Sequence, residues 1–281
     1  MKEVRVNKII NVVKNLCKQA CFSLCMDMIR LLKKAQEDEV SPIGKEVIGL
    51  LLENAELAED LKIPICQDTG VVSIFTEVGQ DVHIVGGDIK EAINEGVRQG
   101  YKEGFLRNSI CHPLTRENTG DNTPAIIHYD IVPGDEIKIS VMPKGAGSEN
   151  VSKAIVLTPA DGLEGIENFV LTSVRATAER AKTCGPLIIG VGIGGNLEMS
   201  TTLAHKALLR TVGGKADDID VAGLEKKWLK AINNFGYGPL GFGGKYTCLA
   251  VHIEIHPCHI ASIPVAVVIQ CHAHRVKKAV I

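Results

Sequence analysis

The sequence predicts a mixed α+β fold, with a helical N-terminal segment packed on a mixed α/β body that contains antiparallel hairpins. Two observations predict it. Apolar side chains recur at helical spacing over residues 5–60, whereas the chain beyond residue 70 alternates between short apolar runs, typical of strands, and amphipathic stretches, typical of helices. Because no internal repeat, low-complexity tract or linker is evident, we expect one catalytic domain over 1–281, with the helical segment at about 1–60 and the body at about 61–281.

The helical segment contains three regularly spaced cysteines. A first helix is expected to carry them at intervals of four residues, and a second helix is expected at about 44–58: the cysteines are Cys17, Cys21 and Cys25. They could form a row of metal ligands. They share their stripe with Val13 and Met28, however, and this favours a role as small buried apolar side chains.

The first half of the body predicts strands, a helix and a hairpin. Two strands are expected on either side of a Gly-Gln-Asp turn, at 71–79 and 81–87. The stretch 88–104 is an amphipathic helix that Asp88 is placed to cap. The stretch 125–145 alternates in polarity around Pro-Gly-Asp, which predicts an antiparallel hairpin.

The second half repeats the alternation of helices and strands. The expected order is a helix at about 164–182, a buried strand at 186–195, helices at 196–210 and 217–235, a glycine-rich loop at 236–246, and strands at 247–255 and 263–270.

Composition excludes several classes of function. A net charge of −2 and an aromatic content of 4% give no basic patch or stacking platform for nucleic acid. No stretch approaches the roughly 18 apolar residues that span a bilayer, and the N-terminus lacks the apolar core of a signal peptide. We therefore expect a cytoplasmic protein that binds neither membrane nor nucleic acid, and whose nine cysteines are mostly thiols.

Two motifs admit alternative functions. GVGIGG at 190–195 has a predicted strand before it and a helix after it, as a dinucleotide-binding turn requires, but no acidic residue ends a strand about 20 residues later. The GVGIGG motif is better explained as a tight turn, or as a set of backbone N–H groups that face an anion, than as the cofactor site of a nicotinamide-dependent dehydrogenase. HPCH at 256–259 and CHAH at 271–274 could build a zinc site, although they flank a strand and do not lie in the short turns that zinc sites use.

Three further cysteines stand at predicted element ends. Cys66 follows an apolar run that we expect to be a strand, Cys184 follows a helix, and Cys271 follows a strand. Single thiols drawn from distant loops suit an iron–sulfur cluster held by three cysteines better than C-x-x-C runs do. Three unrelated buried thiols are the alternative, and spacing alone does not decide between them.

A resemblance to a known family adds to this reading. The chain from about residue 60 to 275 resembles the alpha part of the class I fumarate hydratase and tartrate dehydratase family, through PICQDTG, ENTGDNTPAII, PKGAGSEN, CGPLIIGVGIGG, GFGGKY and HIASIPVAVVIQC. The resemblance implies a [4Fe–4S] cluster held by Cys66, Cys184 and Cys271, with one iron free of cysteine. That iron would act as a Lewis acid on the hydroxyl and carboxylate of a dicarboxylate substrate.

The same resemblance implies roles for five other residues. Asp68 would act in acid–base chemistry or orient the substrate, while Gln67, Arg107, Gly147 and His259 would bind it. Gly145 is an equally plausible owner of the role given to Gly147.

The resemblance also implies partners. Longer family members continue into a second domain, so this chain is expected to be an alpha subunit that needs a separate beta subunit and forms a homodimer within an α2β2 assembly. The expected reaction is the reversible hydration of fumarate to (S)-malate, with L-tartrate dehydration as the nearest alternative. A non-catalytic subunit that houses a cluster and a dehydrogenase that uses GVGIGG are more distant ones.

Overall fold

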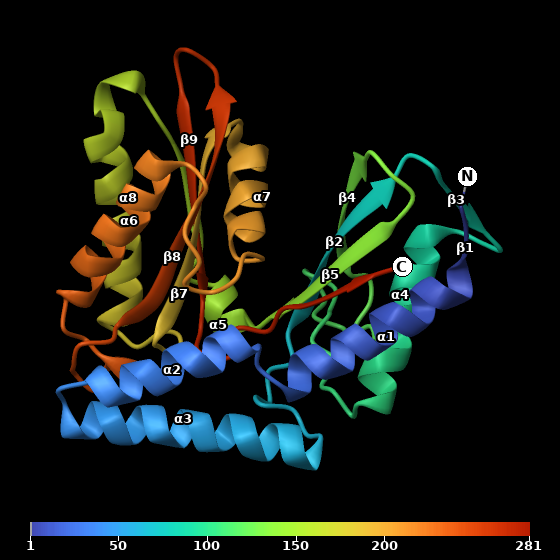
Figure 1. Cartoon of the computed structure of the whole chain (residues 1–281), viewed down its shortest axis with the longest axis horizontal. Coiled ribbons are helices and arrows are strands. Elements are labelled where there is room, and N and C mark those ends of the chain that lie inside the picture. Colours follow the sequence, from blue (N-terminus) through green and yellow to red (C-terminus); the bar gives the residue numbers. More distant parts are fainter. Residues whose placement is uncertain (1) are drawn as a thin grey trace. The chain divides into compact units, whose positions relative to one another are not determined.

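The computed structural model describes residues 2–281 and confirms the mixed α+β fold (Figure 1). Its contacts divide the chain into two compact units. The first unit comprises the chain up to Cys25, Asn54–Ala146 and Arg275–Ile281, and the second comprises Met26–Glu53 and Gly147–His274. The helical segment expected at 1–60 is therefore shared between the units, and the single catalytic domain stays a prediction.

The first unit is built on a four-stranded sheet. Its elements are β1 (Lys2–Arg5), α1 (Val6–Phe22), β2 (Val71–Gly79), β3 (Val82–Val85), α4 (Ile89–Glu103), β4 (Ile126–Val132), β5 (Ile137–Lys144) and β10 (Lys277–Val280). The sheet order is β10-β5-β2-β4, with β4 parallel to β2 and the other neighbours antiparallel. β1 and β3 form a separate parallel pair.

The hairpin predicted at 125–145 is wrong. Both strands exist, but β2 lies between them and pairs with each, so β4 and β5 are not neighbours. The Pro-Gly-Asp turn therefore carries the chain across β2. A turn signal specifies a local reversal, and the partner that a strand finds depends on burial far along the chain.

Helices α1 and α4 pack against each other and cover this sheet (Figure 1). Gly96 and Gly100 allow the close approach, since a Cβ at Gly96 would lie 2.8 Å from the carbonyl oxygen of Ile10. The expected cap at Asp88 is confirmed, because its side chain accepts the N–H of Glu91 at 2.9 Å.

The first helix ends earlier than its cysteine spacing predicts. α1 stops at Phe22, so Cys17 and Cys21 lie on it and Cys25 lies in the connection to the next helix. Cys17 and Cys21 are fully buried, which confirms their role as small apolar side chains, whereas Cys25 is half-buried and donates to the Val276 carbonyl.

The second unit is built on another four-stranded sheet. Its elements are α2 (Met26–Asp38), the first part of α3 (Pro42–Leu61), most of α5 (Ala146–Glu149), β6 (Lys153–Leu157), η1 (Pro159–Asp161), α6 (Gly162–Ala178), β7 (Leu187–Gly195), α7 (Leu197–Ala207), α8 (Ile219–Asn233), η2 (Pro239–Gly241), β8 (Cys248–Cys258) and β9 (Ile263–Gln270). The sheet order is β6-β9-β7-β8, with β8 parallel to β7 and β9 antiparallel to β7 and β6.

Helices cover both faces of this second sheet. α6 and α8 contribute to the core on one face, around the buried Trp228, and α7 packs on the other face (Figure 1). In residues 2–281, no helix is long and apolar enough to cross a membrane.

Candidate functional site

The segment Cys66–Gly70 leads from α3 into β2 and carries three of the predicted site residues. The apolar run before Cys66 forms no strand, so the expectation that Cys66 closes a strand is wrong. Gly70 has a φ of +77°, and a Cβ there would meet the carbonyl group of Lys144. Only glycine fits this turn without strain, and the turn places the preceding side chains just before the sheet.

Asp68 lies at the centre of this segment with both carboxylate oxygens engaged. Its Oδ1 accepts from Nη2 of Arg107 at 2.8 Å and from the N–H of Gly70 at 3.2 Å, and its Oδ2 accepts from the N–H of Ala146 at 2.8 Å. The Asp68 side chain is 21% exposed and that of Arg107 is 55% exposed. The structure therefore brings Asp68 and Arg107 together as a charge-assisted pair that solvent, and hence a small anion, can reach.

The sulfur of Cys66 also lies among hydrogen-bonding groups. The N–H of Asp68 approaches Sγ at 3.4 Å, and the side-chain oxygen of Gln67 lies 3.6 Å from it. The N–H of Asp68 thus donates to the Cys66 sulfur, whereas the Gln67 oxygen accepts from the thiol.

Buried polar side chains that the sequence analysis missed hold the two segments in place. The Thr69 hydroxyl donates to the Arg107 carbonyl at 2.7 Å, and the Tyr101 hydroxyl donates to the Thr69 carbonyl at 2.8 Å. Asn122 accepts from the N–H of Ser109 at 2.6 Å and donates to the Gly70 carbonyl at 3.2 Å.

Arg275 adds a buried positive charge to the same region. It is 3% exposed, and its Nη1 donates to the Asp68 carbonyl at 2.9 Å. Of these side chains, Thr69 lies in the motif PICQDTG and Asn122 lies in the motif ENTGDNTPAII, and those motifs could have pointed to them.

Gly145 and Gly147 differ in what surrounds them. A Cβ at Gly145 would lie 2.9 Å from Oδ2 of Asp68, so the packing of the Asp68 carboxylate explains this glycine. A Cβ at Gly147 would have its nearest neighbour at 3.7 Å, the Lys182 carbonyl oxygen. The chain's own packing does not require a glycine at 147, which leaves that position open to a ligand.

Cys184 and Cys271 lie at one end of the second unit's sheet. The Cys184 carbonyl accepts from the N–H of His272 at 2.9 Å, and β9 ends at Gln270, opposite Ile188 of β7. The structure thus brings these two predicted ligands to the same place, while Cys66 belongs to the first unit.

His259 lies elsewhere in the same unit. It follows the last residue of β8, Cys258, which pairs with Gly195 at the far end of β7. The connection between β8 and β9 appears in red at the top end of the sheet in Figure 1. The structure therefore does not bring His259 to the cysteine end of its own sheet.

The nine cysteines differ in burial, and a buried thiol is less able to bind metal than an accessible one. Burial raises the pKa of Cys21 to about 11 and that of Cys248 to about 12, and it raises the pKa of Cys17 well above its usual value. Cys184 is exposed, and Cys66 and Cys271 are partly exposed. The three predicted ligands are therefore among the accessible thiols, which fits thiolate chemistry better than the buried thiols do.

No group of three or more His, Cys, Asp or Glu side chains within residues 2–281 is arranged to hold a metal ion. This applies to the HPCH and CHAH motifs of the second unit. In CHAH, His272 contacts the Cys184 carbonyl and the buried His274 contacts the Leu208 carbonyl.

The GVGIGG glycines serve packing. Gly190 and Gly192 lie inside β7, where a Cβ would collide with the carbonyl groups of Ala204 and Ser200 on α7. A dinucleotide-binding turn instead begins where the strand ends. The structure therefore gives the dehydrogenase alternative no support.

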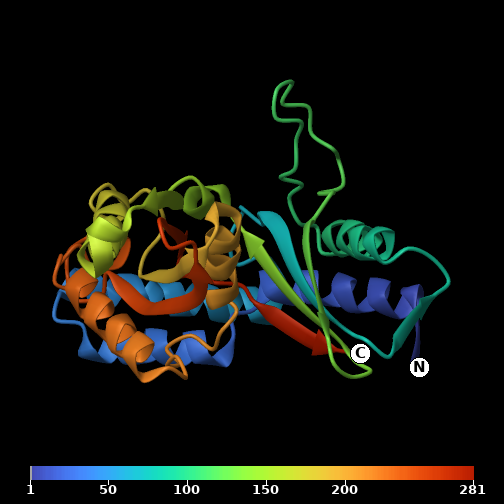
Figure 2. The same ribbon diagram turned by 90° about the horizontal axis from the view of Figure 1, so that it is seen from above.

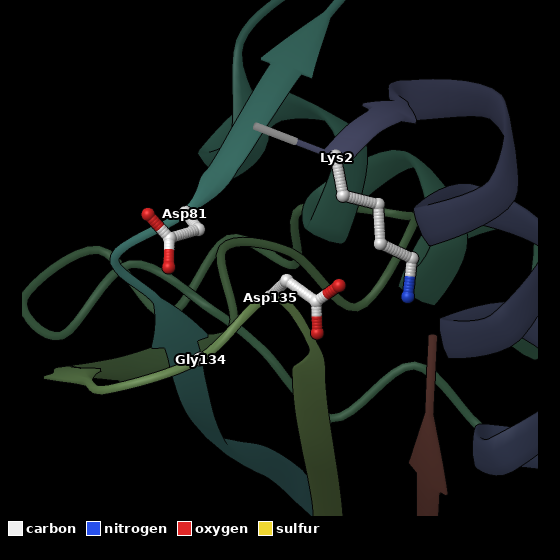
Figure 3. Close-up of a pocket in the computed structure, with 4 residues that line it drawn as sticks. All are labelled: Lys2, Asp81, Gly134 and Asp135. Carbon is white, nitrogen blue, oxygen red and sulfur yellow. The ribbon is translucent and has the colours of Figure 1, made fainter.

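A pocket in the first unit lies apart from all these residues. It is lined by Lys2, Asp81, Gly134 and Asp135 (Figure 3). The Lys2 ammonium donates to the Ile281 carbonyl at 3.3 Å. With two carboxylates facing a single cation that is already engaged, the pocket is poorly suited to a dicarboxylate.

Comparison with known proteins identifies the family of this chain. A protein of Methanocaldococcus jannaschii named "Putative L(+)-tartrate dehydratase subunit alpha" is 43% identical over 274 residues, which cover 95% of each chain. The L(+)-tartrate dehydratase alpha subunits of Escherichia coli K12 and Shigella sonnei are each 32% identical over 278 residues, covering 98% of this chain and 91% of theirs. The sequence model described as Fumarate hydratase (Fumerase) matches residues 10–280. The chain therefore belongs to the fumarate hydratase family, and it is a hydro-lyase.

Proposed function

We propose that this chain is the alpha subunit of an iron–sulfur hydro-lyase that reversibly hydrates fumarate to (S)-malate. One observation carries the proposal: in a chain of this family, Asp68 lies two residues after a partly exposed cysteine, Cys66, and pairs with the exposed Arg107. L(+)-tartrate is a second candidate substrate, and the names of the similar proteins favour it.

Cys66, Cys184 and Cys271 would hold a [4Fe–4S] cluster with one iron free of cysteine. Their accessibility and the N–H donor 3.4 Å from the Cys66 sulfur fit such a cluster. When bound, the cluster supplies a Lewis acid for the substrate's hydroxyl and carboxylate oxygens.

The chain's own side chains would bind and orient the substrate. The Arg107 guanidinium offers a fork that matches a carboxylate, and a substrate carboxylate would compete with Asp68 for it. Gln67 would donate from its amide, and Gly147 from its backbone N–H. Asp68, held by the N–H groups of Gly70 and Ala146, would hold or move the proton at the carbon next to the carboxylate.

The partner proposed for this chain is a beta subunit that completes the pocket. The similar proteins named above are alpha subunits, which implies a second kind of subunit in their enzymes. We expect two alpha chains to associate, giving an α2β2 enzyme.

The test of substrate is anaerobic co-purification with a beta subunit, followed by assays on fumarate, (S)-malate and L(+)-tartrate. We expect a brown complex that contains iron and sulfide and is active on fumarate and malate. Activity on tartrate alone would select the second candidate. A loaded complex that is inactive on all three compounds would contradict both.

The test of the cluster ligands replaces single cysteines by serine. Cys184→Ser and Cys271→Ser are expected to abolish cluster incorporation, measured as bound iron and sulfide. Cys248→Ser is the matched control, since Cys248 lies in the same unit but is fully buried. Equal iron contents in all three variants would show that the ligand assignment is wrong.

A further inference from the structure

The GFGGKY motif at 241–246 closes around a buried carboxylate, that of Glu39. This side chain is 2% exposed, and its two oxygens accept at 2.8–3.1 Å from four backbone N–H groups, those of Val40, Ser41, Lys245 and Tyr246. Burial raises the pKa of Glu39, but these N–H donors together hold the pKa below its usual value. Glu39 is therefore an anion that the chain itself solvates.

The position of Glu39 at the end of α2 is unfavourable for a carboxylate. The helix ends at Asp38, and the N–H of Glu39 donates to the Ala35 carbonyl at 2.9 Å. The carboxyl end of a helix carries a partial negative charge, which repels an anion. A Cβ at Gly244 would lie 2.7 Å from Oε1 of Glu39, so the motif has no side chain where it meets the carboxylate. The loop that Glu39 binds, and not the helix that precedes it, thus explains an acidic residue here.

The loop that Glu39 holds, residues 241–247, contacts the chain on both sides of Cys184. Before Cys184, a Cβ at Gly241 would lie 3.2 Å from the Cβ of Ala181. After Cys184, the N–H of Leu187 donates to the Thr247 carbonyl at 2.9 Å. All of these residues belong to the second unit.

The segment 181–186 forms no helix or strand of its own, and Cys184 in its middle is exposed. Its place therefore depends on the segments that it contacts. We propose that Glu39 is a positioning residue for the iron–sulfur cluster: its carboxylate holds loop 241–247 in the shape that fixes Cys184 for metal binding. The inference rests on the proposed role of Cys184 as a ligand and adds what keeps that ligand in place.

Glu39→Gln tests the proposal with almost no change in volume. Each oxygen of Glu39 accepts from at least two N–H groups, so either orientation of the glutamine amide turns its NH2 group toward N–H donors. In the iron-free full chain, we expect hydrogen exchange to become at least about tenfold faster in 241–247 and in 181–187.

Cluster content provides the second readout for the same variant. After anaerobic reconstitution with the beta subunit, bound iron and sulfide should fall to less than about half of wild type, because one of three ligands is poorly placed. KM and the activity per bound cluster should stay at the wild-type values, because Glu39 does not contact substrate. Faster exchange confined to 241–247, together with a wild-type iron content, would overturn the proposal.

Glu225→Gln is the matched control. Glu225 belongs to the same unit and is 6% exposed, and both of its oxygens also accept from N–H groups, those of Arg210, Ala216 and Ile253. Ile253 pairs with Val191, four residues along β7 from Leu187. We expect Glu225→Gln to reduce stability in urea but to leave the exchange of 181–187 and the cluster content unchanged. Equal losses of cluster in both variants would show that Glu39 acts only through the stability of the unit.

A pair of glycines tests the contact between the loop and the Cys184 segment, and also serves if Glu39→Gln does not fold. Gly241 and Gly243 both have a φ of +81°, so an alanine at either position strains the backbone. Only Gly241→Ala presses on Ala181, since a Cβ at Gly243 would have no neighbour within 4 Å. We expect Gly241→Ala to lose more than about half of its cluster and Gly243→Ala to stay close to wild type. Equal iron contents in the two variants would contradict the proposal.

Failure of the proposed function would look different. A Cys184→Ser variant that keeps its full cluster would disprove the ligand role, whatever the Glu39 variant does. A Cys184→Ser variant without cluster, beside a Glu39→Gln variant with full cluster and wild-type exchange in 181–187, would disprove only the role of Glu39.

Discussion

At the scale of single residues, substitutions of Gly145 and Gly147 distinguish a role in packing Asp68 from a role in binding substrate. Gly145→Ala places a Cβ 2.9 Å from Oδ2 of Asp68, so we expect a fall in kcat of at least about tenfold as the carboxylate moves. Gly147→Ala meets nothing closer than 3.7 Å in the chain and should raise KM about tenfold with little change in kcat, because it obstructs the approach to the backbone N–H. Steady-state kinetics distinguish these outcomes. A rise in KM with Gly145→Ala alone would move the binding role to Gly145.

Asn122 is one of the buried side chains that join the Asp68 segment to the Arg107 segment. It is 0% exposed, and its φ of +59° is one that glycine also adopts, so Asn122→Gly removes both hydrogen bonds without straining the backbone. We expect stability to fall by roughly 1–3 kcal/mol. We also expect KM to rise, because Arg107 and Asp68 lose their fixed separation.

The matched control for Asn122 lies in the same long loop, which Figure 2 shows as the extended excursion between α4 and β4. Asn118 makes the same two kinds of bond, to the Asn108 carbonyl at 3.0 Å and from the N–H of Gly120 at 2.8 Å, but it is exposed. Urea unfolding and kinetics of Asn118→Gly should stay close to wild type. Equal losses of stability and activity in Asn122→Gly and Asn118→Gly would show that Asn122 contributes only to the general order of the loop.

At the scale of elements, β8 contains a buried imidazole that makes stability depend on pH. His252 is 1% exposed, and burial, followed by the nearby positive charge of Arg210, lowers its pKa to about 4, although Asp27 opposes the shift. Its Nε2 accepts from the N–H of Gly213, and its Nδ1 has no hydrogen-bond partner among the described residues. The folded state therefore favours the neutral imidazole.

The sign of this effect follows from proton binding. Between the ordinary histidine pKa of about 6.5 and the folded value of about 4, the unfolded chain binds the proton and the folded chain does not. Stability should therefore fall as pH drops through this window, by up to roughly 3 kcal/mol. When urea unfolding is measured at pH 7 and at pH 5, the free energy of unfolding should fall less between the two pH values for His252→Gln than for wild type. His83→Gln, at an exposed position on β3, is the control, and identical pH dependence in all three proteins would contradict the prediction.

Elements with local signals were predictable from the sequence. The helix expected at 88–104 is α4 with its Asp88 cap, and the strand expected at 186–195 is β7, because capping and apolar runs are properties of neighbouring residues. The β4–β5 hairpin failed because the strand that separates them, β2, lies more than 40 residues earlier. In the site, the place of Cys271 after a strand was visible in sequence, whereas the strand expected before Cys66 does not form. Tyr101 continues the buried stripe of Ile93 and Val97, which predicts its burial but not its hydrogen bond to Thr69, and Arg275 has no periodic or motif signal.

At the scale of the whole molecule, the two sheets share one topology that the sequence does not reveal. In each, a central strand (β2 or β7) lies between a later parallel strand (β4 or β8) and the antiparallel strand that follows it (β5 or β9). The fourth strand then pairs antiparallel with β5 or β9. No matching sequence repeat accompanies this arrangement, because pairing order requires only similar patterns of burial.

Each sheet receives its fourth strand from a segment that follows a strand of the other sheet, so the two fourth strands are exchanged between the units. β6 follows β5 but joins the second unit's sheet, and β10 follows β9 but joins the first unit's sheet. The return of β10 makes the first unit discontinuous, whereas the second unit is discontinuous because Met26–Glu53 belongs to it. The chain's last strand completes the first unit's core, in which Ile281 is buried.

This exchange predicts where a defect in β10 acts. Ile281 exchanges both backbone hydrogen bonds with Ile137, and such pairs alternate along an antiparallel ladder, so Ala279 bonds to Ile139 while the N–H of Val280 points away from β5. Ala279→Pro should remove a ladder bond and lower stability by on the order of 2 kcal/mol, whereas Val280→Pro, at the open edge, keeps the ladder and should cost far less.

Hydrogen exchange locates the damage. In Ala279→Pro, we expect faster exchange in β5, α1 and α4, which share a core with β10, and unchanged exchange in β7 and β9, although β9 is the nearer strand in the sequence. Val280→Pro should leave both sets protected. If β9 loses protection before β5 does, the last strand would be stabilising the unit that precedes it in the chain, and the exchange of edge strands would not govern stability.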